Sequence, residues 1–207
     1  MYMTRVMLTR MPDHDAIHSV ISAAFPGKRD EKSNGYPWRV DNLEDGAALI
    51  IVSAGVPDIK HIVGKLGNGD ARDKSLDYGP FLAEIDRGQT WMFRFCANPV
   101  EHKKTPGENR GKVYALRDIP GQLAWLGRQG ASHGFTVNGC NIIGDKWLIF
   151  NETSADKNRN TVRIRTVTFD GALTVTDADV FRTALTKGIG RGKAYGCGLL
   201  TVAGRQA

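Results

Sequence analysis

The chain has 207 residues, of which 41% are hydrophobic and 24% charged, a composition typical of a folded protein and unlike that of a disordered one. Its longest apolar run, residues 47–52, is far shorter than the roughly 20 residues that a membrane-spanning helix needs, so no membrane partner is expected. The net charge is +6, and the excess lies in residues 91–207, which hold 17 Lys and Arg against 9 Asp and Glu. Such a basic half favours a polyanionic partner, of which nucleic acid is the commonest, over a generically basic surface.

The first half of the chain opens on alternating apolar and polar side chains, which predict a half-buried strand over residues 2–10. Asp13 is a good helix N-cap, and apolar residues at helical spacing predict a helix over 14–25. A second helix is poorly marked in this half. The remaining predicted elements are strands at 36–40 and 47–53, followed by a mobile loop at 64–80.

The second half begins near residue 90 with another alternating strand. Its predicted elements are, in order, a strand at 91–97, a polar basic loop at 101–112, a helix at 119–129, strands at 133–138, 146–151 and 161–169, a tight turn at Asp170-Gly171, a helix from Asp177 to about Leu185, and a last apolar run at 198–203. Each half thus begins with the order strand, helix, strand, strand. This repeated order predicts an α+β protein with two βαββαβ units side by side.

Residues 188–200, GIGRGKAYGCGLL, are dense in glycine without matching a nucleotide-binding loop. A P-loop would need Ser or Thr where Ala194 stands, and a Rossmann fingerprint would need glycine where Tyr195 stands. What remains is a backbone free to approach a ligand closely, at Gly190 and Gly192, with Arg191 and Lys193 as phosphate partners. The alternative is a flexible turn before the last strand.

Several ordered motifs in the chain are similar to those of one known family. The stretch from Thr166 to Leu200, which includes TFDGALTV and GIGRGKAYGCGLL, resembles the C-terminal signature of the CasE-type CRISPR precursor-RNA endoribonucleases of subtype I-E. RFCANPVEHK (94–103), AWL (124–126) and the N-terminal MYMTRVML are similar to further segments of that family. The likeness spans the whole chain, tightly at both ends and loosely between about 30 and 85.

The resemblance implies two tandem ferredoxin-like (RRM-like) domains, 1–88 with a catalytic helix and 91–207 with a basic hairpin and the glycine-rich loop. It implies recognition of the CRISPR repeat RNA stem-loop and metal-independent cleavage, without a cofactor, at the 3′ base of the stem. It also implies that the product stays bound within the Cascade surveillance complex, beside its other subunits. The widely spaced Cys96, Cys140 and Cys197 argue against a disulfide framework and favour a cytoplasmic location.

Metal-independent cleavage of RNA requires proton transfer, for which histidine is suited because its ordinary pKa lies near operating pH. On the first helix, His18 shares a polar stripe with His14 and Ser22 at i±4 and with Asp15 at i−3. The catalytic histidine of the family maps onto His18. Some members have tyrosine where this chain has Asp15, so the second catalytic group stays open, with Asp15 and Ser22 as possible support.

Two other functions remain as alternatives. The missing tyrosine is compatible with a non-catalytic RNA-binding subunit that has the same surfaces. The sequence HDAIH, from His14 to His18, differs from the HExxH zinc-peptidase motif in having Asp, whose side chain is one carbon shorter, in place of Glu. A zinc site there would make the chain a zinc hydrolase. No third zinc ligand can be assigned, so no metal site is predicted.

Two clusters of basic residues are candidate contacts for the RNA stem. A predicted hairpin is slender enough to lie along the groove of an A-form helix. Its basic residues are Lys157, Arg159, Arg163 and Arg165, and those of a second loop are Lys103, Lys104, Arg110 and Lys112. The alternating aromatics Trp91, Phe93 and Phe95 favour core packing over a base-stacking platform.

Overall fold

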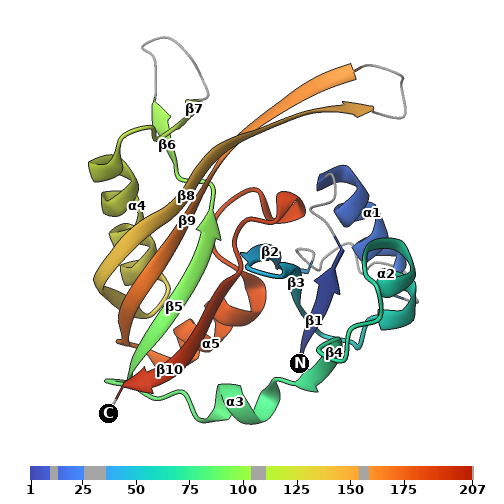
Figure 1. Ribbon diagram of the computed structural model, residues 1–207. Coiled ribbons are helices and arrows are strands. Elements are labelled where there is room, and N and C mark those ends of the chain that lie inside the picture. Colours follow the sequence, from blue (N-terminus) through green and yellow to red (C-terminus); the bar gives the residue numbers. More distant parts are fainter. Residues whose placement is uncertain (10–13, 26–35, 104–110, 154–158, 207) are drawn as a thin grey trace.

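The computed structural model describes residues 1–9, 14–25, 36–103, 111–153 and 159–206. Within these ranges the chain forms two antiparallel four-stranded sheets, one from each half, and a small two-stranded sheet. A long hairpin rises from the second sheet and extends well beyond it (Figure 1). No helix in the described ranges has both the length and the apolar character needed to cross a bilayer.

The first half has the order β1-α1-β2-β3-α2-β4, and its sheet has the strand order β2-β3-β1-β4. This is the arrangement of a ferredoxin-like unit. Its elements are β1 (Tyr2–Leu8), α1 (His14–Ala23), β2 (Trp38–Leu43), β3 (Gly46–Ser53), α2 (Ile59–Leu66) and β4 (Lys74–Asp77). A short helix, α3 (Gly79–Ala83), leads into the second half.

The second half repeats the same topology, with strand order β10-β5-β9-β8, so the predicted α+β fold with tandem ferredoxin-like units is confirmed. The hairpin of β6 (Val100–Lys103) and β7 (Lys112–Ala115) is inserted after the first strand. The other elements are β5 (Thr90–Ala97), α4 (Ile119–Ser132), β8 (Phe135–Thr153), β9 (Arg159–Val175), α5 (Ala178–Lys187), the 3₁₀ helix η1 (Lys193–Tyr195) and β10 (Leu200–Gln206).

Among the described residues, three aspartates each cap the start of a helix, whereas Asp13, the predicted cap of α1, lies outside them. The side chains of Asp58, Asp118 and Asp177 each accept a hydrogen bond from the backbone N–H three residues on, at 3.1, 2.7 and 3.0 Å. Such a cap satisfies an N–H that the helix itself leaves unpaired. The predicted cap at Asp177 is confirmed, and Asp58 marks the start of the helix that sequence periodicity left unclear.

Two of the predicted loops contain regular structure. Residues 64–80, expected to be a mobile loop, hold the end of α2 and the edge strand β4, which pairs with β1 from Tyr2 to Arg5. Residues 101–112, expected to be a loop, contribute to β6 and β7 where they are described. Both segments are polar because they lie at sheet edges, where side chains face solvent.

The prediction of a tight turn at Asp170-Gly171 is wrong, because both residues lie inside β9, between β5 and β8. The strands predicted at 146–151 and 161–169 are the outer parts of two much longer strands. Gly171 is there for space and not for a turn: a Cβ at this position would lie 2.1 Å from the carbonyl oxygen of Gly139, beside an irregularity in the β8–β9 register.

Each half has its own hydrophobic core. The core face of α1 was predicted correctly, since Ile17 and Ile21 are buried against the first sheet. Trp91, Phe93 and Phe95 are buried in the second core, which confirms core packing for the alternating aromatics of β5.

One buried side chain joins the two halves. Arg39 on β2 is 2% exposed and forms a two-pronged ion pair with Asp41, with N–O distances of 2.6 and 2.8 Å. Its guanidinium also donates to the carbonyls of Arg94 and Leu199, at 2.9 and 3.0 Å, and to the hydroxyl of Thr201 at 2.9 Å. The last three partners belong to the second half, so this single group ties the first sheet to β5 and β10.

Replacing Arg39 with methionine should destabilise the protein by about 3–5 kcal/mol, because Asp41 would be left as an unpaired buried charge. Urea unfolding measures this loss. The double variant Arg39→Met/Asp41→Leu is the control and should recover part of the stability, since it removes both charges. Equal stability of wild type and the single variant would show that the Arg39 side chain does not hold the two halves together.

Gly171→Ala should destabilise the second half by about 1–3 kcal/mol, because the new methyl group has no room beside the β8 backbone. Gly139→Ala is the matched control on the neighbouring strand, because nothing lies within 4 Å of a Cβ at that position. Thermal unfolding of the two variants compares them directly. A Gly139 variant that loses as much stability as the Gly171 variant would contradict the steric explanation.

Candidate nucleic-acid interface and active site

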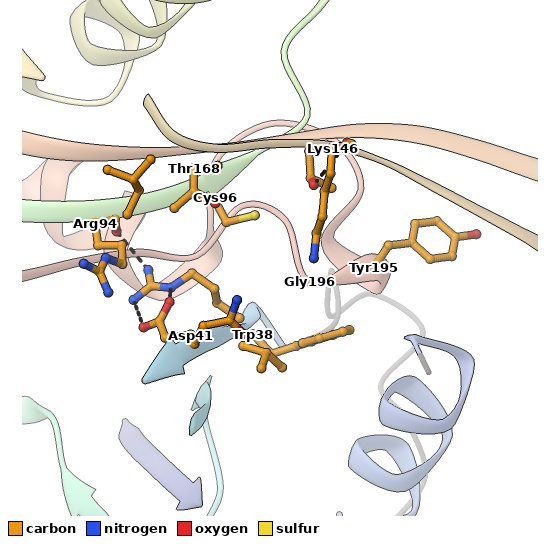
Figure 2. Close-up of a pocket in the computed structure, with 14 residues that line it drawn as sticks. Trp38, Asp41, Arg94, Cys96, Lys146, Thr168, Tyr195 and Gly196 are labelled. Atoms are coloured by element: carbon orange, nitrogen blue, oxygen red, sulfur yellow. Dashed lines mark hydrogen bonds and ion pairs between the residues drawn. The ribbon is translucent and has the colours of Figure 1, made fainter. Parts of the chain in front are cut away.

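A cavity of about 350 Å³ lies between β2 of the first half and the second sheet. Figure 2 shows Lys146 extending into it from the hairpin, with Trp38 on the opposite wall. The glycine-rich loop closes one end through Tyr195 and Gly196. The cavity is therefore built from β2, from three strands of the second sheet and from the glycine-rich loop, which are distant in sequence.

The charges around this cavity are only partly compensated. Asp41 neutralises the charge of Arg39. Asp170 pairs with Arg94 at 2.7 Å, and this pairing raises the pKa of the Arg94 guanidinium. No carboxylate pairs with Lys146 in the part of the chain that the structure describes. The free cation makes the cavity suited to an anion such as a phosphate.

The glycine-rich loop has a specific backbone conformation that depends on its glycines. All five of its glycines have positive φ, and Gly192 and Gly196 flank η1 in the left-handed conformation. The loop is anchored by a hydrogen bond from the Gly198 N–H to the carbonyl of Cys96, at 2.7 Å. A Cβ at Gly196 would lie 2.8 Å from the ring of Trp38, so glycine allows the loop to touch the first half.

The two basic residues of this loop differ in their surroundings. Arg191 is exposed, and no ion pair involves it in the described ranges. Lys193 is half-buried, and its Nζ donates to the carbonyl of Lys187 at 2.8 Å, at the end of α5. Burial and the nearby charge of Lys187 lower the pKa of Lys193. Since an ammonium has three donors, Lys193 can hold α5 and still meet a phosphate.

Helix α1, which carries His18, lies beside this loop. Ile17 and Ile21 are buried, which leaves His18 and Ser22 half-buried at the edge of the helix. The helix contacts η1, so the helix that carries His18 and the glycine-rich loop are neighbours although they lie far apart in sequence. The side chain of Asp15 lies outside the described part of the structure, as does that of His14.

The basic hairpin is confirmed as a feature of the fold, and Arg165 has a partner that the sequence did not reveal. Its guanidinium forms two hydrogen bonds to Asp145, at 2.7 and 2.6 Å, and this pairing lowers the pKa of Asp145. Arg163 is exposed. Lys157 and the side chain of Arg159 lie outside the described residues. Arg163 is thus the described hairpin arginine that is ready to meet a phosphate.

The second basic cluster is described only in part. Lys103 on β6 is exposed and pairs at 2.8 Å with the half-buried Glu101, which raises the pKa of Lys103. Lys112 on β7 is exposed. Lys104 and Arg110 lie in the range that the structure does not describe.

Sequence reasoning missed Arg39, Lys146 and Trp147. No motif surrounds them, and their importance comes from neighbours that only the folded chain supplies. Alternation along β8 could have placed Lys146 and Trp147 on opposite faces had the strand been predicted at its full length. Among the described residues, no group of three or more His, Cys, Asp or Glu side chains could hold a metal ion.

Two ferredoxin-like units, a histidine at the edge of the first helix, a glycine-rich loop and a basic hairpin define the class: a tandem ferredoxin-like protein with the features of an RNA-processing site. A family model described as "CRISPR associated protein" matches residues 1–204. The chain therefore belongs to this family, and the resemblance to CasE-type chains is confirmed.

Individual relatives agree with this assignment. The chain is similar to the CRISPR system Cascade subunit CasE of Escherichia coli, with 25% identity, covering 98% of this chain and 99% of that one. It is 30% identical to the CRISPR-associated endoribonuclease Cse3 of Thermus thermophilus over 60% of each chain. A structure of Thermus thermophilus Cse3 bound to an RNA representing a pre-cleavage complex shares the fold, with a TM-score of 0.76, 24% identity and 98% of both chains covered.

The pair of Arg165 and Asp145 should make stability depend on pH. Because the pairing lowers the folded-state pKa of Asp145, its contribution is complete above the unfolded value of about 3.9 and is lost as the pH falls through the folded value. Asp145→Asn should cost about 0.2–1 kcal/mol at pH 7, and the difference from wild type should shrink below about pH 4. Urea unfolding at pH 7 and pH 3 measures both differences. A difference that is the same at both pH values would contradict this assignment.

Proposed function

We propose that this chain is a metal-independent endoribonuclease that binds the CRISPR repeat RNA stem-loop and cuts the precursor at the 3′ base of the stem. The mature guide RNA then stays bound, and the protein acts in the cytoplasm with the other subunits of a Cascade complex. The observation that supports this proposal most is the meeting of α1, with His18 at its edge, and the glycine-rich loop. The printed functions of the relatives, a Cascade subunit and an endoribonuclease, are in line with it.

The reaction needs no metal ion in this proposal. The 2′-hydroxyl attacks the adjacent phosphorus, a new P–O2′ bond forms and the P–O5′ bond breaks in line with it. The products are a 2′,3′-cyclic phosphate and a free 5′-hydroxyl. His18 takes the proton from the 2′-hydroxyl, and a second group protonates the departing O5′. Asp15 and Ser22, on the same stripe as His18, are the candidates for supporting that exchange.

Binding in this proposal depends on the cations around the site. Arg191 and Lys193 hold phosphates at the glycine-rich loop, whose left-handed glycines let RNA approach the backbone closely at Gly190 and Gly192. Arg163 contacts the phosphates of the stem from the hairpin, assisted by Lys157 and Arg159. Lys103, Lys104, Arg110 and Lys112 clamp the backbone from the second cluster. Affinity should then fall steeply with salt.

A second function is favoured by one observation. Asp15 stands where some family members have a tyrosine, and a carboxylate there would repel the scissile phosphate. The chain would then be a non-catalytic RNA-binding subunit with the same surfaces. The HDAIH sequence supplies a third possibility, a zinc hydrolase, which chelation can test.

In EDTA, the wild type should cleave repeat RNA, and His18→Ala should slow cleavage by about 10²–10⁴-fold while leaving RNA affinity nearly unchanged, because it removes proton transfer and not binding. The matched control is His61→Ala, because His61 is also a half-buried histidine and lies on α2, the other helix that covers the first sheet. This control variant should cleave at the wild-type rate. Single-turnover cleavage and a filter-binding assay give the two quantities.

Other outcomes support the alternatives. Tight binding of repeat RNA by wild type without any cleavage would support the non-catalytic subunit. Activity that chelation removes and zinc restores would support the zinc hydrolase. Cleavage that survives in the His18 variant would remove His18 from the mechanism.

A further inference from the structure

The β8–β9 hairpin has a second face, turned away from the cavity. In the antiparallel register, Trp147 lies opposite Arg165, and Ile149 lies opposite Arg163. Because side chains alternate along a strand, these four residues share one face, while Lys146 lies on the other and lines the interdomain cavity. The two faces therefore present different chemistry to different surroundings.

A groove of about 460 Å³ lies on this second face. It is lined by Trp147, Ile149, Arg163 and Arg165 from the hairpin and by Arg117 from the segment before α4. Trp147 is 41% exposed and Ile149 is 55% exposed. An indole that remains this accessible on a folded surface is available for contact with a ligand.

Guanidinium groups flank the exposed indole. The central carbons of Arg117 and Arg165 lie 5.8 and 5.7 Å from the centroid of the Trp147 ring. Arg165 is held there by Asp145 and by a hydrogen bond of 3.3 Å to the carbonyl of Arg117. The indole is thus supported by a rigid frame, which lowers the entropic cost of stacking another ring on it.

The charge of the groove is positive on balance. The single negative charge of Asp145 is paired with Arg165, and Asp145 also accepts a hydrogen bond from the buried Gln122, at 3.1 Å. No carboxylate pairs with Arg117 or Arg163 among the described residues. Two free guanidiniums therefore lie around one accessible aromatic ring, a combination that suits a nucleotide, with its flat base and its phosphate.

We propose that this groove binds an unpaired nucleotide of the RNA next to the stem, with its base stacked on Trp147 and its phosphate held by Arg117, while Arg163 at the edge of the groove holds the adjoining stem phosphate. The nucleotide must be unpaired because a base inside an A-form stem has both of its faces covered by neighbouring bases. This inference rests on the proposed function, since it assigns the second face of the hairpin to the same bound RNA. The nucleotide can come from the loop of the repeat hairpin or from a strand that flanks the stem.

Four RNA probes distinguish the sources. They are a blunt two-stranded duplex of the stem sequence, the stem-loop, and the stem-loop with a six-nucleotide single strand at its 5′ or its 3′ end. A 2′-deoxy nucleotide at the cut prevents cleavage, so that affinity alone is measured. The protein variants are Trp147→Ala, Trp147→Phe and Arg117→Gln, and the control is Leu76→Ala, which removes an exposed apolar side chain from the other sheet.

Trp147→Ala should bind at least one probe with unpaired nucleotides roughly 5- to 100-fold more weakly than wild type, and should bind the duplex unchanged. Trp147→Phe should retain most of the affinity, because it keeps an aromatic face, and Arg117→Gln should weaken binding of the same probe. The probe that loses affinity identifies the source of the nucleotide. Leu76→Ala should match wild type with every probe.

Three results would overturn the proposal. They are an equal loss of affinity on all four probes, no loss on any of them, and a Trp147→Phe variant as weak as Trp147→Ala. Unchanged RNA affinity would leave a protein partner as the occupant of the face. The proposed function fails separately, if the wild type neither binds nor cleaves the stem-loop. If the wild type cleaves and binds the stem-loop tightly, and Trp147→Ala binds every probe with wild-type affinity, only the proposed nucleotide site is rejected.

Discussion

The guanidinium of Arg39 is the interaction on which the arrangement of the two halves depends. It lies on a strand of the first sheet, and it donates to backbone carbonyls and a hydroxyl that belong to the second. A buried arginine is tolerated only when its charge and its donors are matched, and Asp41 supplies the charge. Because these partners are fixed in direction, the first half cannot rotate against the second without breaking several hydrogen bonds at once.

The proposed site follows from this constraint. His18 belongs to the first half, whereas the glycine-rich loop and the hairpin belong to the second. The contact between α1 and the loop therefore depends on how Arg39 links the two halves and on Gly196, which lets the loop approach Trp38. The two faces of the hairpin differ: Lys146 lines the cavity between the halves, and Trp147 lines the groove on the opposite face. One ribbon of two strands can in this way meet two parts of a single RNA molecule.

Much of the fold could be predicted from the sequence because it depends on local patterns of residues. The core face of α1, the cap at Asp177 and the aromatic strand β5 all follow from periodicity and capping chemistry. Gly171 was misread because a glycine that admits a neighbouring backbone looks the same in sequence as one that makes a turn. The hydrogen bonds of Arg39 to the second half and the pairing of Arg165 with Asp145 could not be predicted, because tertiary packing determines the partners.

The most direct test is a structure of the protein bound to its repeat RNA, with a 2′-deoxy nucleotide at the cut to stop the reaction. We expect the scissile phosphate between α1 and the glycine-rich loop, with the imidazole of His18 within about 3 Å of the position that the 2′-oxygen would occupy. A scissile phosphate bound away from α1, with His18 facing only protein, would contradict the assignment of the active site. The RNA contacts would then have to be explained without it.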